Sequence, residues 1–113
     1  MKYIIGIIQP DRLDDVLDRL TKKEIHLVTV TSVIGRGRQQ GIAEVYRSHK
    51  EPGNLLKKTK LEIAVNEEYV QATVDAITGG ARSGNIGDGK IFIIDLEECI
   101  RIRTGEKGNL AIG

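Results

Sequence analysis

The strongest constraint on the fold comes from two segments that are apolar at nearly every position, residues 2–9 (KYIIGIIQ) and residues 90–95 (KIFIID). A strand that is apolar only at alternate positions can leave one face to water, whereas a strand that is apolar on both sides must be covered on both. The chain has 113 residues, which favours one domain over residues 1–113. Helices on one face of a sheet leave the other face bare. We therefore expect self-association to cover that face.

A helical pattern follows the first apolar segment. Pro10 is tolerated in the first turn of a helix, and an apolar residue recurs on one helical face at Leu13, Val16, Leu17 and Leu20. These residues predict a helix with one face buried against the sheet.

A second helix is predicted to begin at Glu67. Asn66 is a favourable N-cap, acidic residues follow in the first turn, and an apolar stripe continues to Ile77. Gly79 and Gly80 weaken this helix near its end.

Two further strands are predicted at residues 27–34 and 59–65, and a short segment at residues 100–103 is predicted to be extended. The resulting order is β-α-β-β-α-β followed by a tail of about ten residues, from about 104 to 113. This order is that of the ferredoxin-like split βαβ arrangement. We therefore predict an α+β protein, a ferredoxin-like βαββαβ sandwich.

Residues 35–58 form a connection far longer than a hairpin between two strands requires. It contains six Lys or Arg residues and four glycines. Long connections in compact domains are usually functional or disordered, so this loop is a candidate for recognition of a ligand or a partner.

Composition excludes several function classes. The net charge of +1 and an aromatic content of 4% do not favour nucleic-acid binding. Cys99 is the only cysteine, which suits a reducing compartment, and no apolar stretch has the length for membrane insertion; we expect a cytoplasmic protein. His26 and His49 are isolated and lack the spacing of a zinc site. Because no residues supply a nucleophile with its base, we do not expect an enzyme.

The segment from Gly84 to Lys90 fits the spacing G-x-x-x-x-G-K of a phosphate-binding loop. Ile91 stands where such a loop needs Ser or Thr, and the segment leads from a helix into a strand, so we exclude the P-loop NTPases. Closely spaced glycines still allow backbone N–H groups to converge on an anion, with Lys90 as a positive charge. The alternative is a tight turn without a ligand.

Arg101 and Arg103 strengthen the anion-binding interpretation. In an extended segment, residues at i and i+2 share a face, and two guanidinium groups on one face suit phosphate oxygens. The alternative is a solvated edge strand whose positive residues block edge pairing.

At these residues the chain resembles the PII (GlnB/GlnK) nitrogen-regulatory signal-transduction proteins. The resemblance is most specific over residues 87–92 (GDGKIF) and 100–106 (IRIRTGE), and weaker matches run through the rest of the chain. Other matching segments are residues 7–10 (IIQP), 13–16 (LDDV), 29–31 (TVT), 37–39 (GRQ), 46–47 (YR) and Lys58.

The resemblance implies a homotrimer with ATP and ADP competing for clefts between subunits, and with Mg²⁺ and 2-oxoglutarate bound together with ATP. It identifies the long connection as the T-loop, at about residues 36–57. The residues that match the family's nucleotide contacts are Ile7, Thr29, Gly35, Gly37, Arg38, Gln39, Glu62, Ala64, Gly87, Asp88, Gly89, Lys90, Arg101 and Arg103. Those that match its 2-oxoglutarate site are Gln39, Gln40, Gly41 and Lys58, and Gln39 also matches the metal ligand.

The T-loop of the family contacts a target protein, which implies an ammonium transporter, glutamine synthetase or a nitrogenase component as partner. Glu51 replaces the tyrosine that many bacterial members modify, and Gln9 and Gln40 replace basic residues. The loop start at residues 35–39 resembles the nitrogenase-associated branch. Two alternatives remain open: a sensor of the ATP/ADP ratio that has lost its 2-oxoglutarate response, and a slow ATPase.

Overall fold

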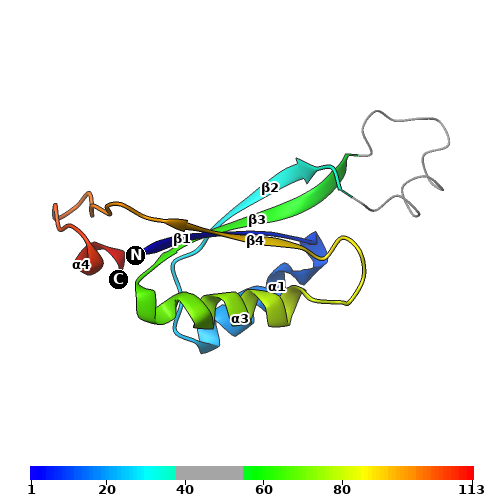
Figure 1. Ribbon diagram of the computed structural model, residues 1–113, viewed down its shortest axis with the longest axis horizontal. Helices are drawn as coiled ribbons and strands as arrows, with labels where there is room; N and C mark the ends of the chain where they lie inside the picture. The colour runs from blue at the N-terminus through cyan, green and yellow to red at the C-terminus, as the bar shows by residue number, and fades with distance from the viewer. Residues whose placement is uncertain (38–54) are drawn as a thin grey trace.

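The computed structural model describes residues 1–37 and 55–113. One antiparallel sheet lies on two long helices, with a short helix at the far end of the sheet (Figure 1). The elements, in chain order, are β1 (Lys2–Ile8), the 3-10 turn η1 (Pro10–Arg12), α1 (Leu13–Lys22), β2 (Thr29–Gly35), β3 (Leu56–Val65), the 3-10 turn η3 (Glu67–Tyr69), α3 (Val70–Ala81), β4 (Gly89–Asp95) and α4 (Asn109–Ile112).

The strand order is β2-β3-β1-β4, and each neighbouring pair is antiparallel. β1 lies between β3 and β4, where Ile4 pairs with Ile63 on one side and with Ile93 on the other. This topology confirms the predicted α+β, ferredoxin-like arrangement, and both segments that are apolar throughout are strands of the sheet.

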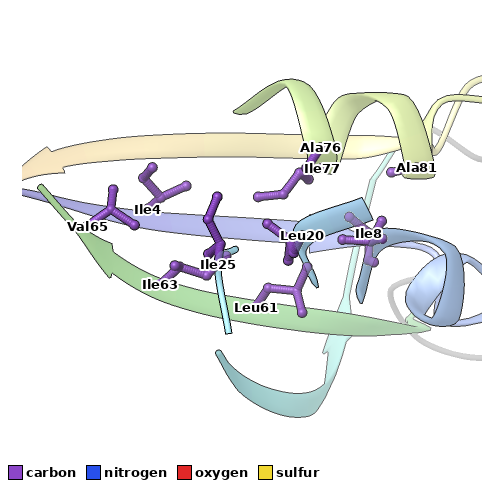
Figure 2. Close-up of a cluster of buried hydrophobic side chains, with 11 residues drawn as sticks. Ile4, Ile8, Leu20, Ile25, Leu61, Ile63, Val65, Ala76, Ile77 and Ala81 are labelled. Carbon is purple, nitrogen blue, oxygen red and sulfur yellow. The ribbon is translucent and has the colours of Figure 1, made fainter. Parts of the chain in front are cut away.

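The core lies between the sheet and the helices α1 and α3 (Figure 2). Alternate residues of β1 and β3 point into it, including Ile4, Ile8, Leu61 and Ile63, each no more than 1% exposed. Complete burial of one such side chain contributes about 1.5–3 kcal/mol. The amphipathic pattern of the first predicted helix is confirmed, since Val16 and Leu20 are its buried residues.

The opposite face of the sheet is also apolar, and α1 and α3 do not cover it (Figure 1). In register, Ile5 lies beside Phe92, and Tyr3 lies beside Ile94. Phe92 and Ile94 remain 48% and 49% exposed. A single subunit therefore leaves the second apolar face open, as the two-sided pattern of these strands predicted.

The sequence-based boundaries differ from the structure by more than one residue at two strands, β2 and β3. β2 begins at Thr29 rather than at residue 27, and β3 begins at Leu56 rather than at residue 59. Pairing of Gly35 with Leu56 and of Val33 with Lys58 extends the sheet into residues that we expected in the loop. Pairing between β2 and β3 decides these boundaries. The sequence does not show it, because Lys57, Lys58 and Lys60 give no alternation of apolar and polar residues.

Asn66 occupies the predicted N-cap position in an extended conformation, but its side chain makes no capping hydrogen bond. Its Nδ2 donates to the carbonyl of Asn109 at 3.2 Å instead, and its Oδ1 is buried without a hydrogen-bond partner among the described residues. The helix starts as the 3-10 turn η3. The predicted N-cap position is therefore confirmed, but its side chain binds the C-terminal segment instead of an N–H group of the helix.

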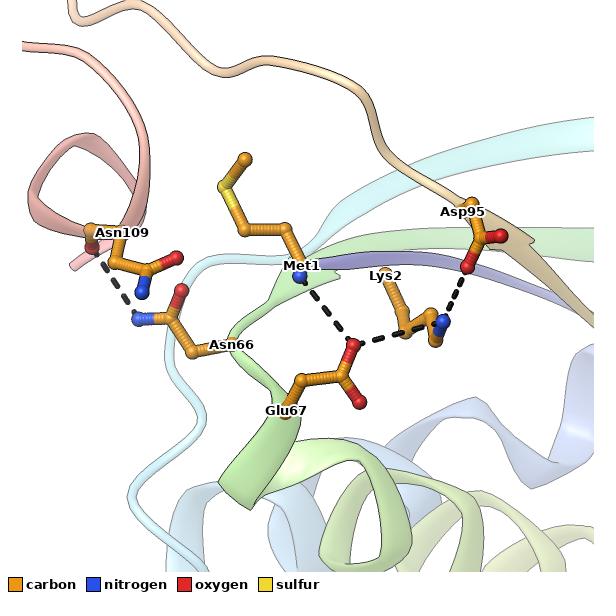
Figure 3. Close-up of polar contacts among 6 residues, drawn as sticks. All are labelled: Met1, Lys2, Asn66, Glu67, Asp95 and Asn109. Carbon is orange, nitrogen blue, oxygen red and sulfur yellow. Dashed lines mark hydrogen bonds and ion pairs between the residues drawn. The ribbon is translucent and has the colours of Figure 1, made fainter.

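A chain of ionic contacts joins three elements at this end of the sheet (Figure 3). Glu67 accepts from the Met1 amino group at 3.4 Å and lies 3.5 Å from the Lys2 ammonium, which also contacts Asp95. The hydrogen bond to Asp95 raises the pKa of Lys2 and lowers that of Asp95. These exposed contacts link the starts of β1 and η3 to the end of β4.

The predicted weak point at Gly79 and Gly80 is where α3 approaches α1. A Cβ at Gly80 would lie 2.9 Å from the backbone N and Cα of Val16. A Cβ at Gly79 would meet only the Arg19 side chain, with Nη1 at 2.8 Å. Gly80 is thus required for the close contact of the two helices, whereas Gly79 is not.

We predict opposite effects of alanine at these neighbouring positions. Gly80→Ala should lower the free energy of unfolding by about 1–3 kcal/mol, because the helices must move apart. Gly79→Ala should raise it by up to about 1 kcal/mol, because alanine favours the helix and the Arg19 side chain can move. Urea unfolding at equal protein concentration measures both. Equal effects at the two positions would contradict this account of the helix contact.

Candidate functional site

The turn before β4 is built from glycines with backbone conformations that other residues avoid. The φ angles of Gly84, Gly87 and Gly89 are 89°, 102° and 110°. A Cβ at Gly89 would lie 1.7 Å from the carbonyl oxygen of Ile7, so only glycine allows the turn to approach β1 this closely. The turn is therefore pressed against the end of β1.

The carboxylate of Asp88 stabilises the turn through hydrogen bonds with residues at the start of the same turn. It accepts from the backbone N–H of Ser83 at 2.7 Å and of Gly84 at 2.9 Å, and from the Ser83 hydroxyl. These hydrogen bonds, first those from Ser83, lower the pKa of Asp88. The side chain of this predicted nucleotide contact thus has a structural role, which leaves its backbone N–H as the group that could meet an anion.

Two side chains hold the carbonyl of Gly87. Gln9 Nε2 donates to it at 2.7 Å and Lys58 Nζ at 3.3 Å. Lys58 is only 8% exposed. Burial lowers the pKa of its ammonium group, and the carboxylate of Asp88 partly opposes that effect. The base of the long loop is thereby connected to the glycine turn.

These groups border a pocket of about 410 Å³ on the face of the sheet that the helices leave open. Among the residues that the structure describes, three cationic side chains line it and no acidic one does. A concave surface with ammonium and guanidinium groups beside glycine N–H groups suits an anion. The lining residues are Ile7, Gly35, Arg36, Gly37, Lys58, Ile86, Gly87, Gly89, Lys90 and Phe92.

Three other predicted contacts, Thr29, Glu62 and Ala64, line a separate pocket of about 490 Å³. In this second pocket the hydroxyl of Tyr3 donates a hydrogen bond to Glu62 Oε2, and this bond raises the pKa of Tyr3. The ammonium Nζ of Lys60 lies 3.8 Å from Glu62 Oε1. The two pockets share no lining residue. Glu62 lies four positions after Lys58 along β3, which corresponds to a distance of about 13 Å.

The segment from Ile100 to Arg103 is not extended, so the prediction that Arg101 and Arg103 share one strand face was wrong. Ile100 makes an isolated bridge with Lys107, and the chain reverses between them. Arg101 donates to Glu106 Oε1 at 2.7 Å and to the carbonyl oxygens of Leu110 and Gly113. Hydrogen bonds from Arg101 to these acceptors in the tail hold residues 100–103 in a turn, although their sequence alone favours a strand.

One subunit also does not bring Arg101 and Lys90 together. β4 separates them, and the tail with α4 lies at the opposite end of the sheet from the glycine turn (Figure 1). The predicted nucleotide contacts thus fall into groups at two ends of the subunit.

Gln9, Arg36, Ile86 and Phe92 also belong to the first pocket or its border, and we did not predict them as site residues. The position of Gln9 just before Pro10, at the end of a buried strand, was the one available signal. Arg38, Gln39, Gln40 and Gly41 lie outside the described residues, and so does the predicted metal ligand among them. Within residues 1–37 and 55–113, no three His, Cys, Asp or Glu side chains are placed to hold a metal ion.

Comparison with known proteins identifies the family. The sequence model described as Nitrogen regulatory protein P-II matches residues 1–106. The chain is 50% identical to nitrogen regulatory protein GlnK1 of Methanosarcina mazei, over 99% of this chain and 97% of the relative. It is 47% identical to nitrogen regulatory protein P-II 1 of Escherichia coli, over 99% and 100%.

A solved structure agrees with these sequence matches. The crystal structure of Arabidopsis thaliana PII bound to citrate is similar with a TM-score of 0.79 and 35% identity, covering 98% of this chain and 88% of that one. In the described part of the chain, no helix has the length and apolar character to cross a bilayer. The relatives are named as regulatory proteins rather than enzymes. From its sequence, its fold and these relatives, the chain belongs to the nitrogen regulatory protein P-II family.

Proposed function

We propose that this protein is a cytoplasmic, non-enzymatic sensor that binds ATP or ADP, and 2-oxoglutarate together with Mg-ATP, and that regulates a target protein through its T-loop. One observation carries the proposal. The cationic pocket joins the Gly87–Gly89 turn, Lys90 and Lys58 at the point where β2 and β3 lead into the T-loop. A phosphate bound there lies next to the base of the segment that would meet the target.

The separation of the two pockets supports nucleotide sites between subunits. In a homotrimer, the open apolar face of the sheet would be buried, and the end of one subunit that carries Lys90 would meet the end of another that carries Glu62 and Arg101. The phosphates would contact the glycine turn and Lys90, and the adenosine would contact Thr29, Glu62 and Ala64 of the neighbour. This arrangement accounts for predicted contacts that lie far apart within one subunit.

Lys58 is the natural partner for a carboxylate of 2-oxoglutarate. Its ammonium group is mostly buried in the cationic pocket, where the attraction of an opposite charge is stronger than in water. The loop residues Gln39, Gln40 and Gly41 would complete this site, with Gln39 also holding Mg²⁺. The relative from Arabidopsis thaliana was solved with citrate, a carboxylate anion. That observation supports small carboxylates as ligands of this family.

Signalling would follow from linkage. A ligand shifts the T-loop between two conformations only by the difference in its affinity for them. Lys58 contacts the Gly87 carbonyl and stands at the start of β3, so a ligand that engages it acts on the turn and the loop base together. An ammonium transporter, glutamine synthetase or a nitrogenase component would be the target.

Titration calorimetry tests the ligands in order. ATP should bind the wild type, and 2-oxoglutarate should bind only when Mg-ATP is present. Lys90→Met should weaken ATP binding about tenfold or more, because it removes a charge-assisted contact to phosphate. Lys22→Met is the matched control, since Lys22 pairs with Asp18 on the outer surface of α1, and it should leave ATP affinity unchanged.

The same titration separates the alternatives. ATP binding without a 2-oxoglutarate response would favour the sensor of the ATP/ADP ratio, to which Gln9 in place of a basic residue points. Continuous phosphate release that Lys90→Met abolishes would favour a slow ATPase. No ATP binding by the wild type would refute the proposed function.

A second prediction concerns assembly. Ile94→Glu places a charge on the open apolar face and should convert a trimer into monomers, because burial of an unpaired carboxylate costs several kcal/mol. Thr21→Glu introduces the same charge at an exposed position of α1, on the other side of the sheet from this face, and should leave the trimer intact. Light scattering after size-exclusion chromatography gives both masses. A wild-type monomer, or a trimer of Ile94→Glu, would show that this face is not the interface.

A further inference from the structure

Gln9 occupies a rigid position at the end of the central strand. Ile8, just before it, pairs with Thr59 on one side and Gly89 on the other. Pro10 follows, which restricts the backbone of Gln9 to extended conformations, and its φ and ψ are −68° and 139°. The Gln9 carbonyl accepts from Arg12 N–H at 3.0 Å. Strand and turn together fix the backbone of Gln9 and therefore the direction of its Cα–Cβ bond.

That side chain ends on the Gly87 carbonyl, with a donor–acceptor distance of 2.7 Å. The carbonyl of Gly87 and the N–H of Asp88 belong to one planar, trans peptide unit. Fixing the direction of the carbonyl therefore fixes the direction of the N–H. Gly87 has a φ of 102° and no side chain that would resist rotation of this peptide, so the hydrogen bonds from Gln9 and Lys58 hold its direction.

The two donors on this carbonyl differ in kind. Gln9 is a neutral amide with the shorter contact, while Lys58 is an ammonium with the longer one, at 3.3 Å. A carbonyl oxygen has two lone pairs and accommodates both. If Lys58 turns to an anionic ligand, Gln9 still satisfies the carbonyl and the turn keeps its shape.

We propose that Gln9 is a positioning residue of the candidate anion site: its amide holds the Gly87 carbonyl, so that the Asp88 N–H keeps one direction whether or not Lys58 Nζ donates to the same carbonyl. The part of this inference that concerns ATP rests on the proposed function. The part that concerns the orientation of the Gly87–Asp88 peptide does not rest on it, because this orientation can be measured without a ligand.

The test compares Gln9→Met, which keeps the length of the side chain without a donor, with Gln9→Lys, which keeps a donor. In the full-length protein without ligand, the ¹³C resonance of the Gly87 carbonyl should move upfield in Gln9→Met and stay near its wild-type position in Gln9→Lys. Calorimetry should show ATP binding about tenfold weaker in Gln9→Met than in the wild type, because the loss of one hydrogen bond changes an affinity by about this factor. Gln9→Lys should bind ATP no more weakly than the wild type. Thermal unfolding confirms that both variants fold.

Each outcome decides the inference. An unchanged Gly87 carbonyl resonance in Gln9→Met, or wild-type ATP affinity in that variant, overturns it. Equal loss of affinity in both variants also overturns it, because a donor would then not be the property that matters. If the wild type binds no ATP, the proposed nucleotide function fails, and the carbonyl resonance alone decides whether Gln9 positions the turn.

Discussion

The central strand β1 is the element on which both the fold and the candidate site depend. Its two edges pair with β3 and β4, and its two faces are both apolar. One face supplies Ile4 and Ile8 to the core under the helices, and the other carries Ile5 and Ile7 on the open side. The same strand contacts the glycine turn at the Ile7 carbonyl, and Gln9 follows its last residue, Ile8. Core packing and the shape of the cationic pocket therefore both depend on the backbone of β1.

The glycine turn depends on this strand because it has few contacts of its own. Asp88 closes it from within, Gln9 and Lys58 hold it from outside, and Gly89 allows it to touch β1. Each contact acts on the backbone, whose N–H groups are the donors suited to phosphate oxygens. A turn held in this way requires little rearrangement when an anion binds, and such preorganisation favours affinity.

Periodic features were predictable from the sequence, and features decided by single contacts were not. The two-sided apolar pattern of residues 2–9 predicted a buried strand with an open second face, because that pattern reflects many residues at once. The orientation of Arg101 depends on Glu106 and on two carbonyl oxygens of the tail, which no local pattern encodes. The contact of Gln9 with the glycine turn was not predictable either, since its partner is 78 residues away.

The division of the predicted contacts between two ends of the subunit has a thermodynamic consequence for the proposed sensor. A ligand that binds a site shared by two subunits binds the assembled state and not the separate chains, so it stabilises the trimer by RT ln(1 + [L]/Kd) per site. In a trimer, each subunit would contribute the glycine turn to one site and Glu62 to another. Occupation of one site would order an element on each of two subunits. Within one subunit β1 connects the two groups of residues, because its start carries Tyr3 beside Glu62 and Gln9 follows its end beside the turn.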